Sequence, residues 1–408
     1  MRVLILNQCY APEEVSGAVL VTELASDFVK GGHQVTVITA APNYPYGRVF
    51  SGYRNRFLSR ERLDGVEVVR TWSYITPQKT FWRRLLNFGS QGATALYGGL
   101  LSGKPEIILV FSPPLPLAVT AWILAAAWRT PWVLQLEDLY PEAAIQAGVL
   151  SNRVAIAFFL AVESFLYKHA TRVSVISETF REIVKSKGIA PDKLKLIPLW
   201  ADPNSVLPLP KDNKFRRRHD LRGKFVVLYA GNHGITSCLE EVVSAAERLR
   251  DDPDVRFVFV GEGVKKGSLQ EAAQEKELKN VLFLPYQPRE DYPVMLAAAD
   301  LSVVTLNRES STTSLPSKAF GIMASGRPIL AICPDDSELA NLIREAECGV
   351  NIPTGDPPRI ADTIRQLKND ASRLDLWGSN GRAQVEGRFS RAHCVRLFEE
   401  MLQDLLHS

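Results

Sequence analysis

Residues 2–39, RVLILNQCYAPEEVSGAVLVTELASDFVKGGHQVTVIT, decide the fold class. Arg2–Leu6 is a short apolar run typical of a buried strand, and Ala18–Lys30 has the periodicity of a helix. The helix ends at Gly31-Gly32, directly before a second apolar run, Val35–Thr39. Glycine commonly ends a helix, so this order predicts a strand–helix–strand unit with parallel strands.

The same alternation continues through the first half of the chain. Further strands are predicted at Val66–Thr71, Ile107–Phe111, Trp132–Leu136 and Val173–Ile176. Strands separated by helices indicate a doubly wound α/β domain with a parallel sheet. The apolar segment Leu115–Trp128 is shorter than the ~20 residues that cross a bilayer, and Glu163 interrupts Ala155–Leu166. Both are predicted to be helices that cover a sheet.

Phe81–Leu101 is a more ambiguous helix. Its apolar and aromatic residues lie beside Arg83 and Arg84. We expect an amphipathic helix that faces the core, and the alternative is a monotopic contact with a membrane.

A linker follows residue 200. Prolines at 203, 208 and 210 precede the charged run Lys211–Arg218, and the strand–helix alternation then restarts. The strands predicted here are Phe225–Tyr229, Val255–Val260, Val281–Leu284, Leu301–Thr305, Ile329–Ile332 and Gly349–Ile352, and the helices are Leu239–Arg250 and Ser268–Lys279. The 408 residues therefore suit two Rossmann-like domains, 1–203 and 204–385. The last segment, 386–408, contains an amphipathic helix at His393–Leu406 that we expect to pack on the first domain. A ligand-binding cleft is expected between the two sheets.

Composition indicates a globular enzyme, with 46% apolar and 23% charged residues. The five cysteines are scattered without a C-x-x-C pair, which favours free thiols in a reducing compartment. Because the N-terminal apolar run is short and lacks a cleavage site, we expect a cytoplasmic protein.

Charge is distributed unevenly. Residues 1–200 carry 21 basic and 15 acidic side chains, whereas residues 201–408 carry 27 and 30. The basic excess gathers at Arg48, Arg54, Arg56, Arg60, Arg62, Arg70, Lys79, Arg83 and Arg84. It suits an anionic membrane or a phosphate-bearing acceptor, with an ordinary solvated surface as the alternative. No nucleic-acid-binding motif accompanies it.

In each half of the chain, a glycine-containing loop follows the first strand. Gly17 stands where a helix begins, so a phosphate or sugar could approach the backbone there, although a plain turn glycine is the alternative. Gly231-Asn232-His233-Gly234 occupies the corresponding place in the second half, where Asn232 and His233 offer side-chain hydrogen bonds.

Several other signals are weak. FVFVGEG at 257–263 lacks the third glycine of a dinucleotide fingerprint and is interpreted as a turn. Asp252-Pro253-Asp254 precedes a strand and is also a turn. The histidines lack metal-ligand spacing, so no metal site is expected, and no G-x-S-x-G occurs.

The segment 307–318, NRESSTTSLPSK, is the most informative loop. It is rich in hydroxyls, precedes a helix and is bracketed by Arg308 and Lys318. Hydroxyls, free amides and two cations suit a diphosphate, and the alternative is a polar surface loop with two incidental basic residues. Cations placed in advance also stabilise the charge that develops on a nucleotide diphosphate leaving a sugar.

An acidic pair follows an apolar strand at Glu137-Asp138. Carboxylates at the carboxyl end of a strand could bind sugar hydroxyls or stabilise an oxocarbenium-like centre. A helix-capping role is the alternative for Asp138.

These motifs, taken in order, resemble those of glycosyltransferase family 4, of GT-B fold, in the bacterial branch that makes exopolysaccharide, colanic-acid-like and O-antigen sugars. The resemblance covers essentially the whole chain and is carried by Ser16-Gly17, Leu136–Glu142, Tyr229–Asn232, Phe259–Gly263, Ala298–Leu301, Leu315–Lys318 and Ile322–Pro328.

The resemblance implies an N-terminal acceptor-binding domain and a C-terminal domain that binds the nucleotide sugar. It implies catalytic roles for Asp138, Arg308 and Lys318. Donor contacts would come from Gly17, Asn232, His233, Pro285, Tyr286, Thr313, Ser314, Leu315, Pro316 and Ser317. Glu137, Tyr10 and Ser16 would contact acceptor or sugar. No metal and no cofactor beyond a nucleotide sugar, expected to be UDP-linked, is implied.

Two positions depart from the family pattern. Its usual pair of glutamates falls on Thr313 and Gly321, and the second glutamate usually holds the ribose. Ribose recognition is therefore expected elsewhere in the sequence, or donor affinity is lower.

The sequence thus predicts a retaining transferase that moves a hexose, with glucose from UDP-glucose as the first choice, to a lipid-linked or oligosaccharide acceptor. It would work in the cytoplasm or peripherally at the inner face of the membrane. The alternatives are a GT-B sugar-nucleotide epimerase, a non-catalytic nucleotide-sugar-binding module and, more remotely, a dehydrogenase.

Overall fold

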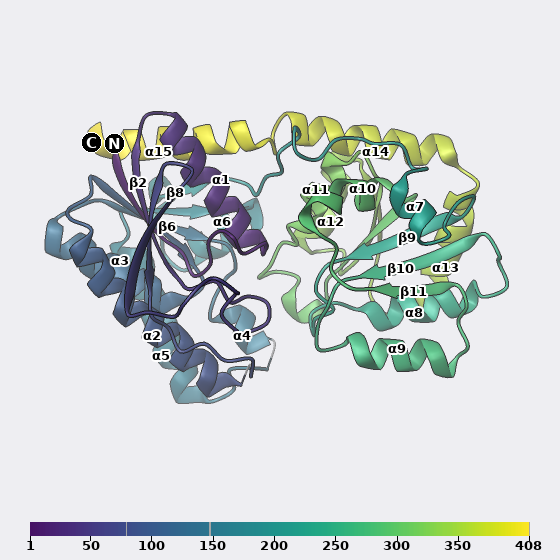
Figure 1. Ribbon diagram of the computed structural model, residues 1–408, viewed down its shortest axis with the longest axis horizontal. Helices are drawn as coiled ribbons and strands as arrows, with labels where there is room; N and C mark the ends of the chain where they lie inside the picture. Colours follow the sequence, from purple (N-terminus) through teal and green to yellow (C-terminus); the bar gives the residue numbers. More distant parts are fainter. Residues whose placement is uncertain (79, 147, 408) are drawn as a thin grey trace. The chain divides into compact units, whose positions relative to one another are not determined.

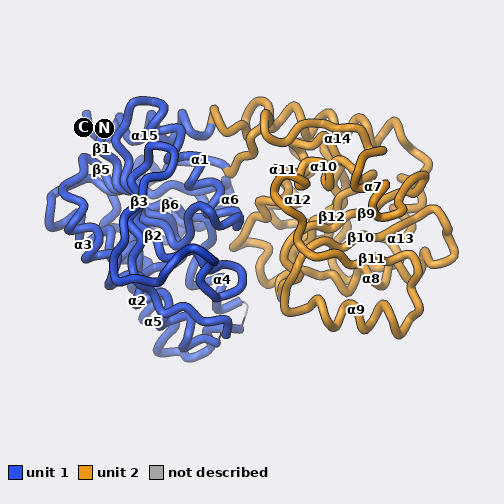
Figure 2. The backbone as a smooth tube through the Cα atoms, viewed as in Figure 1, with its two compact units in different colours: residues 1–198, 394–408 blue, residues 199–393 orange. Residues whose placement is uncertain are grey.

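The computed structural model describes residues 1–78, 80–146 and 148–407. The chain divides into two compact units (Figure 2). Unit 1 comprises residues 1–198 and 394–408, and unit 2 comprises residues 199–393.

Unit 1 is built on one sheet, which over the described residues has eight strands in the order β3-β4-β2-β1-β5-β6-β7-β8. The strands are β1 Arg2–Leu6, β2 Gln34–Ala40, β3 Leu58–Leu63, β4 Val66–Thr71, β5 Ile107–Ser112, β6 Trp132–Leu136, β7 Arg172–Val175 and β8 Leu194–Leu196. All neighbouring pairs are parallel except β3 with β4. The predicted doubly wound sheet is therefore present, with an antiparallel edge strand that was not predicted.

The edge strand β3 was missed because its sequence, LSRERL, has only two apolar residues. It is held by a tight hairpin in which Asp64 and Gly65 both have positive φ, 49° and 82°. Such turns match the twist of paired strands.

The helices of unit 1 cover this sheet (Figure 1). They are α1 Ser16–Lys30, α2 Phe81–Leu101, α3 Leu115–Trp128, α4 Glu142–Gln146, α5 Arg153–His169 and α6 Glu178–Ser186, with a 3-10 turn at Pro191–Lys193. The last helix of the chain, α15 Arg391–His407, enters unit 1 at residue 394. There Phe398 lies 6.4 Å from Phe111 between ring centroids, and Glu399 lies 2.7 Å from the His33 ring.

Helix α2 is buried along only half of its length. Its second half packs closely through glycines: a Cβ on Gly98 would lie 2.8 Å from Thr71, and one on Gly92 would lie 2.9 Å from Pro116. None of the residues 81–90, in contrast, is buried. The core-facing interpretation of this helix therefore holds for its second half only.

Unit 2 contains a wholly parallel sheet in the order β11-β10-β9-β12-β13-β14. The strands are β9 Phe225–Ala230, β10 Val255–Val260, β11 Val281–Leu284, β12 Leu301–Thr305, β13 Ile329–Ile332 and β14 Gly349–Ile352. The helices are α7 Lys214–Arg218, α8 Leu239–Arg248, α9 Lys266–Glu275, α10 Tyr292–Ala297, α11 Lys318–Ala324, α12 Glu338–Ala346, α13 Pro357–Lys368 and α14 Ala371–Glu386, with 3-10 turns at Arg289–Asp291 and η3 Arg308–Ser310.

In the part of the chain that the structure describes, no helix is long and apolar enough to span a bilayer.

Candidate functional site

The centre of unit 2 has the topology of a ligand-binding sheet. From β9 the chain moves to β10 and β11 on one side, and it later returns to β12, β13 and β14 on the other. Ligands of open α/β sheets bind outside the carboxyl ends of the strands where the order reverses. In unit 2 this point lies between β9 and β12, and the loops that follow these strands carry Gly231, Asn232 and Arg308.

The loops after β9 and β10 touch each other through glycines in unusual conformations. Gly231, Gly261 and Gly263 have φ of 144°, 140° and 155°, a region that L side chains rarely adopt. A Cβ on Gly261 would overlap the carbonyl of Gly231. The amide of His233 also donates to the carbonyl of Glu262 at 2.8 Å. Both loops are therefore fixed by their backbones.

Lys318 brings a positive charge to these loops. Its Nζ donates to the hydroxyl of Tyr229 at 2.8 Å and lies 4.1 Å from the centroid of that ring. The Tyr229 hydroxyl donates in turn to the carbonyl of Asn232 at 2.7 Å. Among the described residues Lys318 forms no ion pair with a carboxylate. Its charge is therefore held by neutral groups and available to an anion.

Gly231 leaves the space that Lys318 occupies. A Cβ there would lie 2.7 Å from the Lys318 Nζ. Gly231 is thus needed both for its positive φ and for the approach of the amine to the backbone.

Arg308 provides a second cation, on the loop between β12 and α11 that leads to Lys318. It begins the turn η3, in which the amide of Ser310 donates a hydrogen bond to Asn307 Oδ1 at 3.1 Å. Arg308 is exposed, and its guanidinium forms no ion pair with any residue that the structure describes. It is therefore free to turn toward a ligand.

The hydroxyls of this loop are only partly available. Ser310, Ser311 and Thr313 are buried, and the Ser311 hydroxyl donates to the carbonyl of Arg308 at 2.8 Å. Ser314 and Ser317 are partly exposed, whereas Leu315 is buried. The amides of Ala319 and Phe320 donate to the carbonyls of Pro316 and Ser317. The start of α11 therefore offers fewer free N–H groups than the sequence indicated.

His233 requires a correction. Its side chain was expected to contact the donor, but the ring is fully buried beside Tyr229, Phe259 and Phe283. Burial first, and then the charges of Lys266 and Lys318, lower the pKa of His233 to about 4. A neutral imidazole packs there as a core residue, and only its backbone lies in the loop.

Lys266 was missed by the sequence analysis. Its Nζ donates to the carbonyl of Gly261 at 2.9 Å, to that of Leu284 at 3.3 Å and to Glu262 Oε1 at 2.8 Å. These bonds hold the loops after β10 and β11 together. Nothing in the sequence distinguishes this lysine from an ordinary residue in the first turn of a helix.

Gly321, where the family has its second glutamate, contacts Tyr292. A Cβ on Gly321 would overlap the Tyr292 hydroxyl. Burial raises the pKa of Tyr292 to about 12, and its hydroxyl makes no hydrogen bond with any described residue. The Tyr292 hydroxyl, which comes from α10, therefore lies beside Gly321, one turn after Lys318 in α11, with no partner among the described residues.

Pro285 and Tyr286 follow β11 at the same edge of the sheet, and both are exposed. Their position is compatible with contact to a planar base.

In unit 1 the loop after β1 is organised by a buried carboxylate, Glu13, which the sequence analysis did not single out. Glu13 accepts from the amides of Tyr10 at 3.1 Å, Asn43 at 2.9 Å and Tyr44 at 2.8 Å. Burial raises its pKa, and these bonds oppose the shift.

Tyr10 also requires a correction, because its side chain is buried and cannot contact acceptor or sugar as expected. Ser16 and Gly17, which open α1, are partly exposed, and a Cβ on Gly17 would meet nothing within 4 Å. The start of α1 is therefore open.

Glu137 and Asp138 directly follow β6 and are both partly exposed. Burial, reinforced by the charge of Asp138, raises the pKa of Glu137 to about 7, whereas a bond of 3.4 Å from Gln135 opposes the shift. The pair thus combines a carboxyl group that titrates near neutral pH with a second acid beside it.

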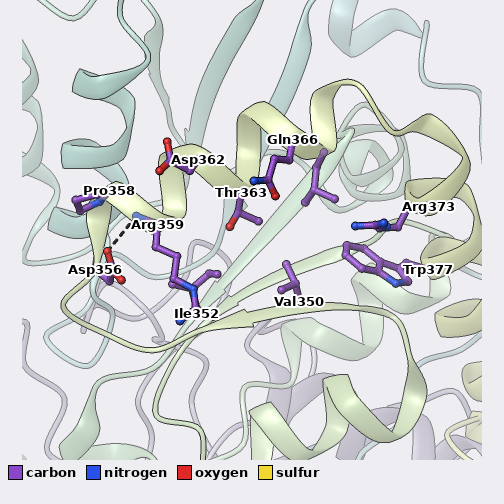
Figure 3. A pocket seen from close by; sticks show the side chains of 11 residues that line it. Val350, Ile352, Asp356, Pro358, Arg359, Asp362, Thr363, Gln366, Arg373 and Trp377 are labelled. Atoms are coloured by element: carbon purple, nitrogen blue, oxygen red, sulfur yellow. Dashed lines mark hydrogen bonds between the residues drawn. The ribbon is translucent and has the colours of Figure 1, made fainter.

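Two cavities lie away from these residues. One, of about 470 Å³, is lined by residues of β14, α13 and α14, including Arg359, Arg373 and Trp377 (Figure 3). The other, of about 770 Å³, lies between α2, α3 and α5. None of the predicted site residues lines either cavity. No cluster of potential metal ligands occurs within the described residues.

Comparison with known proteins places this geometry in a family. Residues 17–200 match the "Glycosyl transferase 4-like domain" and residues 211–384 match "Glycosyl transferases group 1". The chain is 29% identical to "Probable glycosyltransferase WbjE" of Pseudomonas aeruginosa, over 74% of this chain and 76% of that protein. It is also 29% identical to "Putative colanic acid biosynthesis glycosyl transferase WcaI" of Escherichia coli, over 84% and 86%.

Solved structures share the fold at lower identity. Sucrose-phosphate synthase from Thermosynechococcus elongatus aligns with a TM-score of 0.78 at 17% identity, over 99% of both chains. HepE of Anabaena, solved with UDP-glucose, aligns with a TM-score of 0.73 at 16% identity, over 98% of this chain and 99% of that one. The chain is therefore a glycosyltransferase of the GT-B fold, in which a glycosyl transferase 4-like domain is followed by a group 1 domain.

Proposed function

We propose that the protein transfers glucose from UDP-glucose, with retention of configuration and without a metal, to a lipid-linked or oligosaccharide acceptor in polysaccharide synthesis. The observation that carries this proposal is Lys318, a cation that forms no ion pair with any described carboxylate and lies where the strand order of unit 2 reverses. The similarity to the colanic acid transferase of E. coli and to a fold solved with UDP-glucose supports the choice of pathway and donor.

Transfer forms a bond between the acceptor oxygen and the sugar C1, and it breaks the bond from C1 to the diphosphate. Negative charge develops on the leaving UDP, where Lys318 and Arg308 would stabilise it. In a retaining reaction the acceptor approaches the face that UDP leaves, so its proton passes to the departing phosphate oxygen. Asp138, with Glu137 beside it, would stabilise the positive charge at C1.

We also propose that the Tyr292 hydroxyl binds the ribose, in place of the glutamate that the family has at position 321. Two observations support this: the hydroxyl has no hydrogen-bond partner among the described residues, and it adjoins Gly321, which lies one turn after Lys318 in α11. Replacing Tyr292 with Phe should weaken UDP binding about tenfold and leave binding of inorganic diphosphate unchanged. Equal UDP affinity would exclude the ribose contact.

The experiment that tests the function is a screen of UDP-, GDP-, ADP- and TDP-sugars without added metal, read by thermal shift and by release of the nucleotide. We expect stabilisation by UDP-glucose and slow release of UDP with water as acceptor. Anomeric configuration of a product formed on an added acceptor then tests retention. Conversion of the sugar nucleotide to its epimer without acceptor would instead indicate an epimerase, and binding without turnover would indicate a binding module.

A further inference from the structure

Unit 1 exposes an unusually continuous apolar surface. The first ten residues of α5, RVAIAFFLAV, are apolar except for Arg153, yet none of the residues 153–162 is buried. None of the residues 81–90 of α2 is buried either, although this segment includes Arg83, Arg84, Asn87 and Ser90 besides its apolar side chains. Val154, Trp82 and Phe158 are 79%, 71% and 62% exposed. Folded soluble surfaces seldom leave such a patch in water, so it indicates an interaction site.

The two helices flank a groove. A cavity of about 770 Å³ is lined by residues of α2, α3 and α5, among them Phe81, Trp82, Leu96, Ile123 and Phe158. Thr120 and Asn152 are the polar side chains among its lining residues. Thr120 already donates its hydroxyl to the carbonyl of Gly92 at 2.8 Å, and Asn152 caps α5. The groove therefore offers apolar contact rather than polar recognition.

The charges around the groove are almost all positive. Neither α2 nor α3 contains an acidic residue, and the one acid of α5, Glu163, is buried and bonded to Lys187 at 2.6 Å. Arg84 and Arg153 are exposed and pair with no carboxylate among the described residues. Lys79 lies outside the described residues.

The wider basic excess noted in the sequence contributes less. Arg70 is buried and donates to Glu61 and to the carbonyls of Ala11 and Ala40, and Arg60 pairs with Glu67 at 3.1 Å. These arginines stabilise the β3–β4 hairpin and its surroundings. Arg54 and Arg56 are exposed and form no ion pair with a described residue, but neither lines the groove, whereas Arg84 and Arg153 belong to the helices that flank it.

We propose that residues 81–90 and 153–162 dock unit 1 onto an anionic lipid bilayer, with an acyl chain in the groove between α2, α3 and α5. Aromatic and aliphatic side chains would enter the interface while Arg84 and Arg153 contact lipid phosphates. A second copy of the chain is a poorer occupant, because a two-fold contact would bring the same cations together. The surface is independent of the donor site, so it extends the proposed function rather than resting on it.

Vesicle co-sedimentation tests the proposal on the full chain. Phosphatidylcholine vesicles are compared with vesicles that contain equal amounts of phosphatidylcholine and phosphatidylglycerol. We expect binding to the mixed vesicles that weakens as salt increases, because exposed charges are screened. Trp82→Ser and Phe158→Ser should each weaken this binding about tenfold, and Arg153→Glu should weaken it about fivefold.

Matched controls come from unit 2. Leu376 is 59% exposed, close to the 62% of Phe158, and Arg217 is exposed like Arg153. Leu376→Ser and Arg217→Glu should bind vesicles as the wild type does. Brominated phosphatidylglycerol should also quench fluorescence in the wild type more than in Trp82→Phe, since Trp82 lines the groove.

The proposal is overturned if the wild type binds neither vesicle, or if Phe158→Ser and Leu376→Ser behave alike. Light scattering that reveals a dimer dissociated by Phe158→Ser would also overturn it, in favour of a second copy. UDP binding and UDP-glucose hydrolysis, measured without vesicles on the same samples, should be unchanged in every variant. Absence of UDP binding in the wild type would refute the donor assignment and leave the vesicle result standing.

Discussion

At the scale of single residues, Glu137, which follows β6 in unit 1, should make the free energy of unfolding depend on pH. Its pKa rises from the ordinary 4.5 to about 7 on folding. Below about pH 4.5 the carboxyl group is protonated in both states and contributes nothing. Between there and pH 7 the unfolded chain loses a proton that the folded chain keeps, so the free energy of unfolding falls as pH rises. Above pH 7 the penalty is constant, at most about 3 kcal/mol.

Glu137→Gln should therefore gain stability over the wild type as pH rises through this window. The measurement is urea unfolding of both proteins at about pH 5 and about pH 8. A difference between the two proteins that does not change with pH would contradict the raised pKa.

Gly321 and Tyr292 form a second residue-scale test. Gly321→Ala should lower the free energy of unfolding by about 1–3 kcal/mol, because the new methyl group overlaps the Tyr292 hydroxyl. The ring carbon that bears the hydroxyl is 3.4 Å from that methyl position, which is an ordinary contact. Tyr292→Phe should therefore restore most of the loss. A double-mutant cycle with no coupling would show that the two residues do not meet.

At the scale of elements, replacing a glycine in the loops after β9 and β10 should lower the free energy of unfolding more than replacing a glycine in the neighbouring helix. Gly261→Ala should cost more than about 3 kcal/mol, since it combines a φ of 140° with an overlap on the Gly231 carbonyl. Gly267 in α9 is the control, because a Cβ there meets nothing within 4 Å. Gly267→Ala should stabilise by up to about 1 kcal/mol. Similar unfolding midpoints for the two variants would refute this packing of the loops.

Elements with clear periodicity were predicted from the sequence to within a few residues. The strands Arg2–Leu6, Trp132–Leu136 and Val255–Val260 and the helix Leu115–Trp128 have the predicted bounds. Strand β3 was missed because it is a strand through its antiparallel pairing with β4, and its own sequence has no apolar alternation.

Residues whose chemistry is visible in the chain, such as Lys318 and Arg308, could be proposed from the sequence, and their roles at the site stay predictions. The candidate site was not predictable where burial decides. His233 and Tyr10 have side chains suited to ligands, but neighbouring aromatic and apolar residues enclose them. Lys266, Glu13 and Tyr292 act through contacts with residues distant in sequence, which composition and spacing do not reveal.

At the scale of the whole molecule, the chain returns to unit 1 through α15. Phe398 is 1% exposed and contacts Phe111 of β5. Phe398→Ala should therefore destabilise unit 1 by about 3–5 kcal/mol without affecting unit 2. Hydrogen exchange can separate the two units: protection should fall in β1 and β5 and persist in β9 and β10. Equal loss of protection in both sheets would contradict this assignment of the helix.

The central claim is that a diphosphate binds at Lys318, and titration calorimetry of UDP with the wild type, Lys318→Met and Lys265→Met tests it most directly. Lys265 is a control cation because Glu240 already neutralises it, at 2.6 Å. The account predicts that UDP binds the wild type and Lys265→Met alike and binds Lys318→Met at least about tenfold more weakly. Equal affinity in all three proteins, with folding intact, would contradict it.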